Sequence, residues 1–219
     1  MIKLTDWGKI EYLKAWAGQE KLVKERLENE RGEDLVILAE HESVYTIGRR
    51  GKRENILVGE EGLKKLGIPV YEVDRGGDIT YHGPGQLMVY FILHLKLFNY
   101  DVHVMMRWME GLVISLLREY GLEGYRIPGK SGVWCNGKKI ASLGLGFRRW
   151  VSFHGLAFNV NPELKFFSYI HPCGFKNIEM TSLARESGAE IDITQAKKVF
   201  IQNWQNSYRT LGQLEFAKK

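Results

Sequence analysis

The segment from Arg75 to Gln86 constrains this chain more than any other stretch. Its twelve residues, RGGDITYHGPGQ, include four glycines and a proline, and the apolar run Leu87–Leu93 follows directly. Glycine at this density indicates sharp turns or a backbone that a ligand approaches closely. The apolar run is typical of a buried strand. Because polar loops beside rigid strands often carry binding residues, the segment is either a ligand-binding loop or a plain glycine-rich connection.

Helical and strand patterns alternate without a regular repeat along the rest of the chain. Helices are expected from about Trp7 to Glu30, from Gly62 to Leu66, from a cap at Asp101 to about Tyr120, and after a cap at Thr194. Strands are expected at 34–39, 44–47 and 70–73, with a strand pair over 150–160. Asn136-Gly137 between two apolar runs predicts a two-residue hairpin turn.

This mixture of hairpins and helices predicts an α+β fold and not a series of strand–helix crossover units. One domain over residues 1–219 is expected, and the last forty residues could form a small appended lobe.

Composition excludes several classes of protein. No apolar run approaches the roughly 20 residues that span a bilayer, and the first residues lack the pattern of a signal peptide. Two cysteines in 219 residues do not form a disulfide framework, which favours a reducing, cytoplasmic location. The net charge of +5 favours an acidic partner, but no nucleic-acid-binding motif accompanies it. No metal-ligand spacing and no Walker A loop occur, so neither a metal nor a nucleotide cofactor is expected.

Cys173, in the segment His-Pro-Cys-Gly-Phe, is the candidate nucleophile. Proline and glycine beside a cysteine favour a bend that can present the thiol, and a neighbouring cation would lower the thiol pKa. The alternative is an inert buried cysteine, which is the preferred interpretation of Cys135. Lys138 and Lys139 follow the hairpin turn, so one is expected on each face of the strand, and spacing does not decide which faces a cleft.

Several motifs together resemble the octanoyl-[acyl carrier protein]:protein N-octanoyltransferase family, the lipoyl(octanoyl) transferases. The motifs lie between residues 41 and 183: His41-Glu-x-Val-Tyr-Thr-x-Gly48, Arg75 to Gln86, Gly132-Val-Trp134, Lys139-Ile-Ala-Ser-Leu-Gly144, His154-Gly-x-Ala-x-Asn159, Pro172-Cys-Gly174 and Met180-Thr-Ser-Leu183. The twelve-residue motif and Pro-Cys-Gly are each fairly specific.

The resemblance implies a mixed, largely antiparallel sheet with flanking helices, similar to the catalytic domain of biotin and lipoate protein ligases. It also implies octanoyl transfer from octanoyl-acyl carrier protein to a lysine of lipoyl domains, those of 2-oxoacid dehydrogenase complexes and the glycine cleavage H protein. Cys173 would carry the acyl group as a thioester, Lys139 would lower its pKa, and Lys139 or His82 would accept a proton from the acceptor lysine. The implied substrate-binding residues are Arg75, Gly76, Gly77, Asp78, Ile79, Thr80, Tyr81, His82, Ser142, Leu143, Gly144, Gly155, Leu156 and Ala157, with His41 and His154 as supporting residues.

Two other functions remain open at this point. An ATP-dependent lipoate or biotin protein ligase would share the fold but would need no cysteine nucleophile. A binding module without catalytic activity would capture acyl groups or acidic proteins and form no covalent adduct.

Overall fold

The computed structural model describes residues 2–29, 32–174 and 178–216. For residues 60, 173 and 209–216 it describes the backbone alone. The first half of the chain contains β1 (Ile2–Lys9), α1 (Tyr12–Glu28), β2 (Asp34–Glu40), β3 (Val44–Ile47), η1 (Arg53–Asn55), α2 (Gly59–Leu66), β4 (Val70–Glu72), β5 (Ile79–His82), β6 (Gln86–Ile92) and η2 (Leu95–Phe98). The second half contains α3 (Val102–Glu119), β7 (Tyr125–Ile127), β8 (Lys130–Cys135), β9 (Lys138–Arg148), β10 (Val151–Asn159), η3 (Leu164–Tyr169), η4 (Pro172–Gly174), α4 (Leu183–Ser187) and α5 (Ile193–Phe216).

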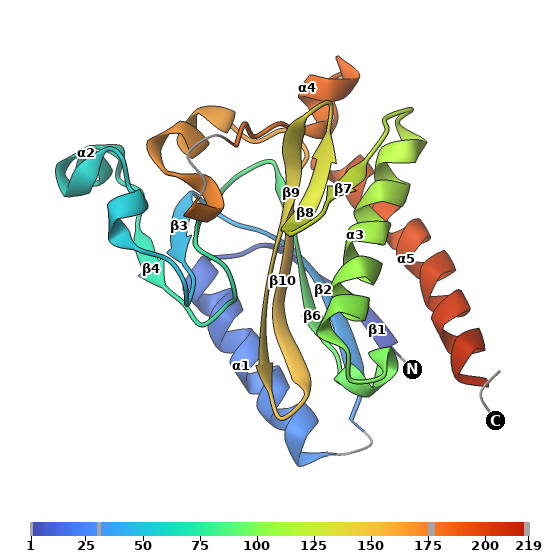
Figure 1. Cartoon of the computed structure of the whole chain (residues 1–219). Coiled ribbons are helices and arrows are strands. Elements are labelled where there is room, and N and C mark those ends of the chain that lie inside the picture. The colour runs from blue at the N-terminus through green and yellow to red at the C-terminus, as the bar shows by residue number, and fades with distance from the viewer. Residues whose placement is uncertain (1, 30–31, 175–177, 217–219) are drawn as a thin grey trace.

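The strands form two sheets (Figure 1). The larger sheet has the order β1-β2-β6-β10-β9-β8-β7, in which only the β1–β2 pair is parallel. The smaller sheet has the order β4-β3-β5, with β3 parallel to β4 and antiparallel to β5. The expected α+β fold with a mixed, largely antiparallel sheet and flanking helices is therefore confirmed.

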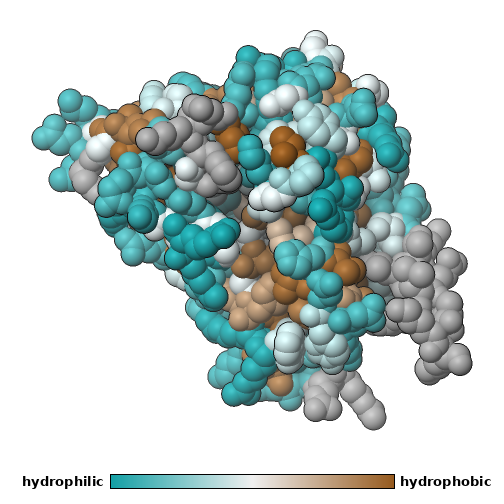
Figure 2. Space-filling model, in the orientation of Figure 1, coloured by the Kyte–Doolittle hydropathy of each residue, from teal (hydrophilic) through white to brown (hydrophobic). Residues whose placement is uncertain are grey.

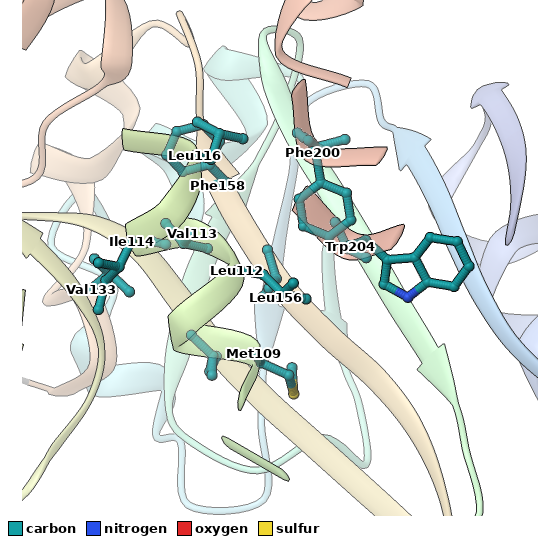
Figure 3. Packing of buried hydrophobic residues seen from close by; sticks show 14 of the residues in the cluster. Met109, Leu112, Val113, Ile114, Leu116, Val133, Leu156, Phe158, Phe200 and Trp204 are labelled. Atoms are coloured by element: carbon teal, nitrogen blue, oxygen red, sulfur yellow. The ribbon is translucent and has the colours of Figure 1, made fainter. Parts of the chain in front are cut away.

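Helices cover both faces of the larger sheet. On one face α3 and α5 bury the main core, in which Met109 and Leu112 of α3 lie near Leu156 of β10 and near Phe200 and Trp204 of α5 (Figure 3). On the other face α1 contributes Ala15 and Val23 to a second cluster, with side chains of β2, β6 and β10. Because β6 and β10 are covered on both faces, each reads as a nearly continuous apolar run.

Several local expectations are confirmed by the elements that form. Asp101 caps α3 by accepting hydrogen bonds from the backbone N–H groups of His103 and Val104. Asn136 and Gly137 turn between β8 and β9 with φ of 48° and 80°, the left-handed geometry of a two-residue hairpin.

Three local expectations are wrong, the first two because long-range strand pairing outweighs the local pattern. Trp7 lies in β1 and not in a helix, because residues 2–9 pair with β2. Residues 151–159 form one strand that pairs with β6 and β9, so the expected strand pair does not form within 150–160. Thr194 lies inside α5, where its backbone N–H donates to Asp192. The expected appended lobe is also absent among the described residues, because Phe200 and Trp204 of α5 belong to the main core.

Gly155 has no room for a side chain in the centre of the larger sheet. A Cβ atom there would overlap the carbonyl oxygen of Val89 and would lie 2.9 Å from a ring carbon of Phe91. We expect Gly155→Ala to lower the free energy of unfolding by about 3 kcal/mol or more, because strand backbone has to move. Gly111→Ala on α3 is the control; its Cβ would meet only Arg126 at 3.6 Å, and alanine favours helix. Urea denaturation measures both, and equal stabilities would contradict the expectation.

Candidate active site

A cavity of about 330 Å³ lies between the larger sheet and the smaller one. Its lining comes from α1 (Tyr12), β5 (Ile79, Thr80, His82), β6 (Met88, Tyr90), β8 (Lys130, Ser131), β9 (Lys139, Ser142, Leu143, Gly144), β10 (His154, Gly155, Leu156, Ala157), η4 (Gly174) and the loops that carry Arg50, Arg75, Gly77, Asp78 and Gly129. Figure 2 shows hydrophobic residues in the hollowed middle of one face, bordered by hydrophilic ones.

The glycine-rich segment lies directly on β9, and both contribute lining residues to this cavity. The backbone N–H of Gly76 donates to the carbonyl oxygen of Leu145 at 2.8 Å. A Cβ atom on Gly144 would lie only 2.8 Å from the carbonyl oxygen of Gly76. Two glycines therefore let the two backbones touch beside the cavity.

Arg75 holds the glycine-rich segment to β3 through a buried guanidinium group. Its Nε and Nη2 donate to the hydroxyl of Thr46 at 3.1 and 2.9 Å, and Nη2 also donates to the carbonyl oxygen of Thr46 at 2.6 Å. Its Nη1 donates to the carbonyl oxygen of Gly76 at 3.0 Å. Because the side chain is only 8% exposed, these bonds compensate for the loss of water around the charge.

Lys139 extends into the cavity wall and is 2% exposed. Its Nζ lies 5.2 Å from the centre of the Trp134 ring, within the range of a cation–π contact. A Cβ on Gly132 would lie 2.6 Å from Cε of Lys139, so the glycine makes room for the lysine stem. Lys138 is directed elsewhere, since its Nζ lies 3.5 Å from a carboxylate oxygen of Glu179. The structure thus shows that Lys139 faces the cavity and Lys138 does not, which the spacing left undecided.

The segment after the Cys173 turn is attached to Lys139 by backbone hydrogen bonds. The Lys139 N–H donates to the carbonyl oxygen of Glu179 at 2.8 Å, and the Thr181 N–H donates to the carbonyl oxygen of Lys139 at 2.9 Å. The Cys173 backbone belongs to the short 3₁₀ turn η4, and its side chain lies outside the part that the structure describes. Gly174, the next residue, lines the same cavity as Lys139.

His82 is held as a neutral imidazole by its hydrogen bonds. Asn159 donates its amide to the carbonyl oxygen of Thr181, so Oδ1 of Asn159 accepts from the Gln86 amide. Oε1 of Gln86 therefore accepts from Nδ1 of His82 at 2.8 Å. Nε2 of His82 in turn accepts from the hydroxyl of Thr46 at 3.2 Å.

The surroundings of His82 argue against its expected role as a proton acceptor. The lone pairs of the Thr46 hydroxyl are occupied by Arg75, so a second ring proton would have no acceptor. Burial, with the charge of Arg75 second, lowers the pKa of His82 to about 3. His82 therefore shapes the cavity as a neutral group, and Lys139 remains the candidate for proton transfer.

The other two expected histidines occupy different places. His154 lines the cavity with φ of 58°, and its Nε2 lies 2.9 Å from a carboxylate oxygen of Asp74. That hydrogen bond lowers the pKa of Asp74, whereas burial lowers the pKa of His154. His41 lies behind the cavity wall, where Nδ1 bonds the carbonyl oxygen of Ile10 and Nε2 bonds the hydroxyl of Tyr90.

Most of the residues that the sequence nominates gather at this one cavity. Those that line it are Arg75, Gly77, Asp78, Ile79, Thr80, His82, Lys139, Ser142, Leu143, Gly144, His154, Gly155, Leu156 and Ala157. Gly76 and Tyr81 are not among the lining residues. The Tyr81 ring packs against Phe166 and Phe167 in the core beneath the smaller sheet, and its hydroxyl bonds that of Ser43.

Sequence reasoning missed several residues of the cavity. Tyr12 on α1 stacks on the His82 ring, and nothing in its local pattern distinguishes it from a core tyrosine. Met88 and Tyr90 are two residues apart on β6 and therefore point to the same face of the strand. This alternation identifies them as cavity residues only when it is known which face of β6 borders the cavity. Arg50 and Lys130 lie on the lining as exposed cations.

Three buried histidines predict an acid-sensitive fold. Burial lowers the pKa of His41, His82 and His154, so the folded protein leaves them neutral while the unfolded chain binds protons below about pH 6.5. Their contribution to stability is therefore complete above that pH and is lost as the pH falls, by up to about 1.4 kcal/mol per pH unit for each histidine.

We expect the free energy of unfolding to decrease between pH 7.5 and 5.5 in urea titrations. The variant His82→Gln should show a shallower decrease, because its unfolded chain takes up one proton fewer. Equal slopes for the variant and the unmodified protein would contradict a neutral His82.

Among the described residues, no group of three metal-binding side chains occurs. No helix in the described part of the chain has the length and apolarity to cross a membrane.

Comparisons with known proteins identify relatives of this chain in sequence and in fold. The model of the lipoyl protein ligase A/B catalytic domain matches residues 11–205. An octanoyltransferase of Bacteroides fragilis is 44% identical over 203 residues, which cover 89% of this chain and 92% of that protein. An octanoyltransferase of Caldicellulosiruptor bescii is 46% identical over 186 residues, covering 84% of this chain and 81% of that protein.

Solved structures with the same fold include two kinds of ligase. Lipoate-protein ligase A bound with ATP superposes with a TM-score of 0.77 at 17% identity, over 95% of this chain and 85% of that one. Biotin protein ligase from Aquifex aeolicus superposes with a TM-score of 0.52 at 12% identity, over 97% of this chain and 71% of that one. At these identities the likeness shows the shared fold.

Proposed function

This chain belongs to the lipoyl protein ligase A/B catalytic domain family and, within it, to the octanoyltransferases, and we propose that it transfers octanoyl groups through a thioester on Cys173. It is an acyltransferase of protein lipoylation. The proposed donor is octanoyl-acyl carrier protein. The proposed acceptor is a lysine of a lipoyl domain, in 2-oxoacid dehydrogenase complexes or the glycine cleavage H protein.

One observation carries this proposal: Lys139 and the turn that contains Cys173 meet at one cavity. Gly174 and Lys139 both line it, although they come from different parts of the chain. An ammonium group close to a cysteine favours the thiolate, which is the nucleophilic form. The cavity is also lined by Leu143, Leu156 and Ala157, which suit an acyl chain.

In the first step the Cys173 thiolate attacks the thioester carbonyl of the donor. A new thioester forms on Cys173, and the bond to the carrier's sulfur breaks. Lys139 gives its proton to the departing sulfur, so the carrier leaves as a thiol and Lys139 becomes neutral. Since one thioester replaces another of similar energy, this step requires no ATP.

In the second step the acceptor lysine attacks the thioester on Cys173. Its neutral amine forms the amide bond, the bond to the Cys173 sulfur breaks, and the amine loses a proton. Neutral Lys139 accepts that proton, which restores the thiolate and ammonium of the resting enzyme. Lys139 thus regains in the second step the proton that it gave up in the first, and no further reactant is consumed.

The acyl chain occupies the apolar part of the cavity in this proposal. Burial of about six methylenes at about 0.8 kcal/mol each gives on the order of 5 kcal/mol of binding free energy. Acyl chains that differ by one or two methylenes differ little in this binding free energy, so the exclusion of longer chains requires a cavity with a closed end. In this proposal, the backbone contact of Gly76 with Gly144 and Leu145 forms that closed end.

Charge at the cavity suits an acidic donor. Arg50 and Lys130 are exposed lining residues, and the chain carries a net charge of +5. Exposed cations around an opening attract an acidic protein and raise its rate of association. This supports a carrier protein as the donor in preference to a free fatty acid.

An ATP-dependent ligase is the alternative function on this fold. The two functions use different octanoyl donors, and only the ligase requires ATP, so one experiment distinguishes them. We expect the purified protein, mixed with octanoyl-carrier protein and a lipoyl domain without ATP, to add one octanoyl group to the lipoyl domain. Intact-mass spectrometry measures the product. Free octanoate with ATP and magnesium is the matched reaction for a ligase.

Transfer only from octanoate and ATP would overturn the proposal in favour of the ligase. Absence of product from both donors, with a folded protein that still binds the acyl carrier, would favour a binding module.

A further inference from the structure

The turn that contains Cys173 is attached to the rest of the protein through Asn55. The backbone N–H of His171 donates to the carbonyl oxygen of Asn55 at 2.8 Å, and the N–H of Gly174 donates to the carbonyl oxygen of His171 at 2.9 Å. Next to Asn55, Ile56 and Ile170 form an antiparallel bridge. The chain therefore enters η4 from a short two-stranded contact with the end of η1.

The side chain of Asn55 binds a second part of the site. Its Nδ2 lies 2.9 and 3.0 Å from the two carboxylate oxygens of Asp78. Oδ1 of Asp78 also accepts the backbone N–H of Ile79 at 2.6 Å, which fixes the carboxylate at the start of β5. Asn55 thus contacts two parts of the site. Its main chain binds the Cys173 turn, and its side chain binds the glycine-rich segment.

Gly174 completes the arrangement because the Asp78 carboxylate occupies the space where its side chain would lie. A Cβ on Gly174 would be 2.5 Å from Oδ2 of Asp78 and 3.7 Å from Nδ2 of Asn55. Its φ of 74° is also one that glycine adopts most readily. Asp78 and Gly174 both line the cavity, so Asn55 supports the wall at the residue next to the proposed nucleophile.

We propose that Asn55 is a positioning residue that, paired with Asp78, holds the Cys173 turn in register with the cavity wall. The inference rests on the proposed function, because it assigns Asn55 an effect on catalysis through Cys173. It adds a residue from η1, outside every motif that identifies the site. Small displacements of a reacting group are enough to slow a reaction about 100-fold, so such a clamp affects rate more than binding.

The first test compares Asn55→Ala with Glu54→Ala, an exposed neighbour in the same turn. We expect Asn55→Ala to lower kcat for acylation of Cys173 at least tenfold with KM for the donor nearly unchanged. Glu54→Ala should retain the unmodified kcat. Hydrogen exchange of peptides that contain His171 and Gly174 should accelerate in Asn55→Ala and not in Glu54→Ala.

A second test exchanges the two partners. Asn55→Asp places two carboxylates opposite each other and should impair kcat more than Asn55→Ala does. Combining Asn55→Asp with Asp78→Asn restores an amide facing a carboxylate and should recover kcat relative to Asn55→Asp alone. Recovery in the double variant identifies the pair itself as the cause, because a defect unrelated to the contact with Asp78 would not be reversed by a substitution at Asp78.

Two results would overturn the inference: unchanged hydrogen exchange with unchanged kcat in Asn55→Ala, or no recovery in the exchanged pair. The exchange measurement needs no substrate, so it tests the clamp even if the proposed chemistry fails. Absence of an octanoyl adduct on the unmodified protein would instead count against the proposed function.

Discussion

Replacing Cys173 by serine is expected to lower octanoyl transfer by on the order of 10³-fold or more. A serine hydroxyl ionises far less readily than a thiol, so an adjacent ammonium group leaves it protonated at neutral pH. The unmodified protein mixed with octanoyl-carrier protein should gain the mass of one octanoyl group, and Cys173→Ser should gain none.

Cys135→Ala is the matched control for this experiment. Cys135 is fully buried in the main core, and burial raises the pKa of its thiol, so it should carry no acyl group. The Cys135→Ala protein should keep the adduct. An adduct and unchanged turnover in Cys173→Ser would refute the proposal that Cys173 is the nucleophile. Loss of the adduct in Cys135→Ala alone would identify Cys135 as the nucleophile instead.

The second large effect is expected at Lys139. Lys139→Met keeps an unbranched side chain beside Trp134 but removes the ammonium group. Octanoyl transfer should fall by about 10²–10⁴-fold, the usual contribution of a positioned proton donor and acceptor. Alkylation of Cys173 by iodoacetamide should also need a higher pH, because the thiolate loses a neighbouring cation.

Lys138→Met serves as its control, since Lys138 contacts Glu179 and does not line the cavity. Its transfer rate and its alkylation profile should match those of the unmodified protein. If Lys139→Met left the pH profile of Cys173 alkylation unchanged, the two groups would not interact and the proposed proton route would fail.

Local sequence patterns predicted much of the fold because they depend on neighbouring residues. The Asp101 cap and the Asn136-Gly137 turn require only the backbone geometry of a few residues, so both formed as expected. The pattern at Trp7 failed because pairing of residues 2–9 with β2 outweighs a helical spacing of apolar residues. Strand pairing between distant segments is not encoded in the periodicity of either segment.

The candidate site was predictable in part for a related reason. The glycine density at 75–86 indicated sharp turns or a closely approached backbone, and in the structure the backbone of Gly76 contacts that of Gly144. Tyr12 and Asn55 gave no local signal, because each reaches the site only through the packing of α1 and η1. His82 looked like a candidate base because a sequence does not reveal which neighbours occupy both ring nitrogens.

By itself the sequence determined the type of most elements, the family motifs and the nomination of Cys173 and Lys139, since these depend on residue identity and short-range order. Only the tertiary structure decided that Lys139 and not Lys138 faces the cavity, that His82 stays neutral, and that Asn55 reaches the Cys173 turn. Those three outcomes depend on burial and on hydrogen bonds between residues far apart in the chain. Desolvation and long-range pairing exist only once the chain has folded.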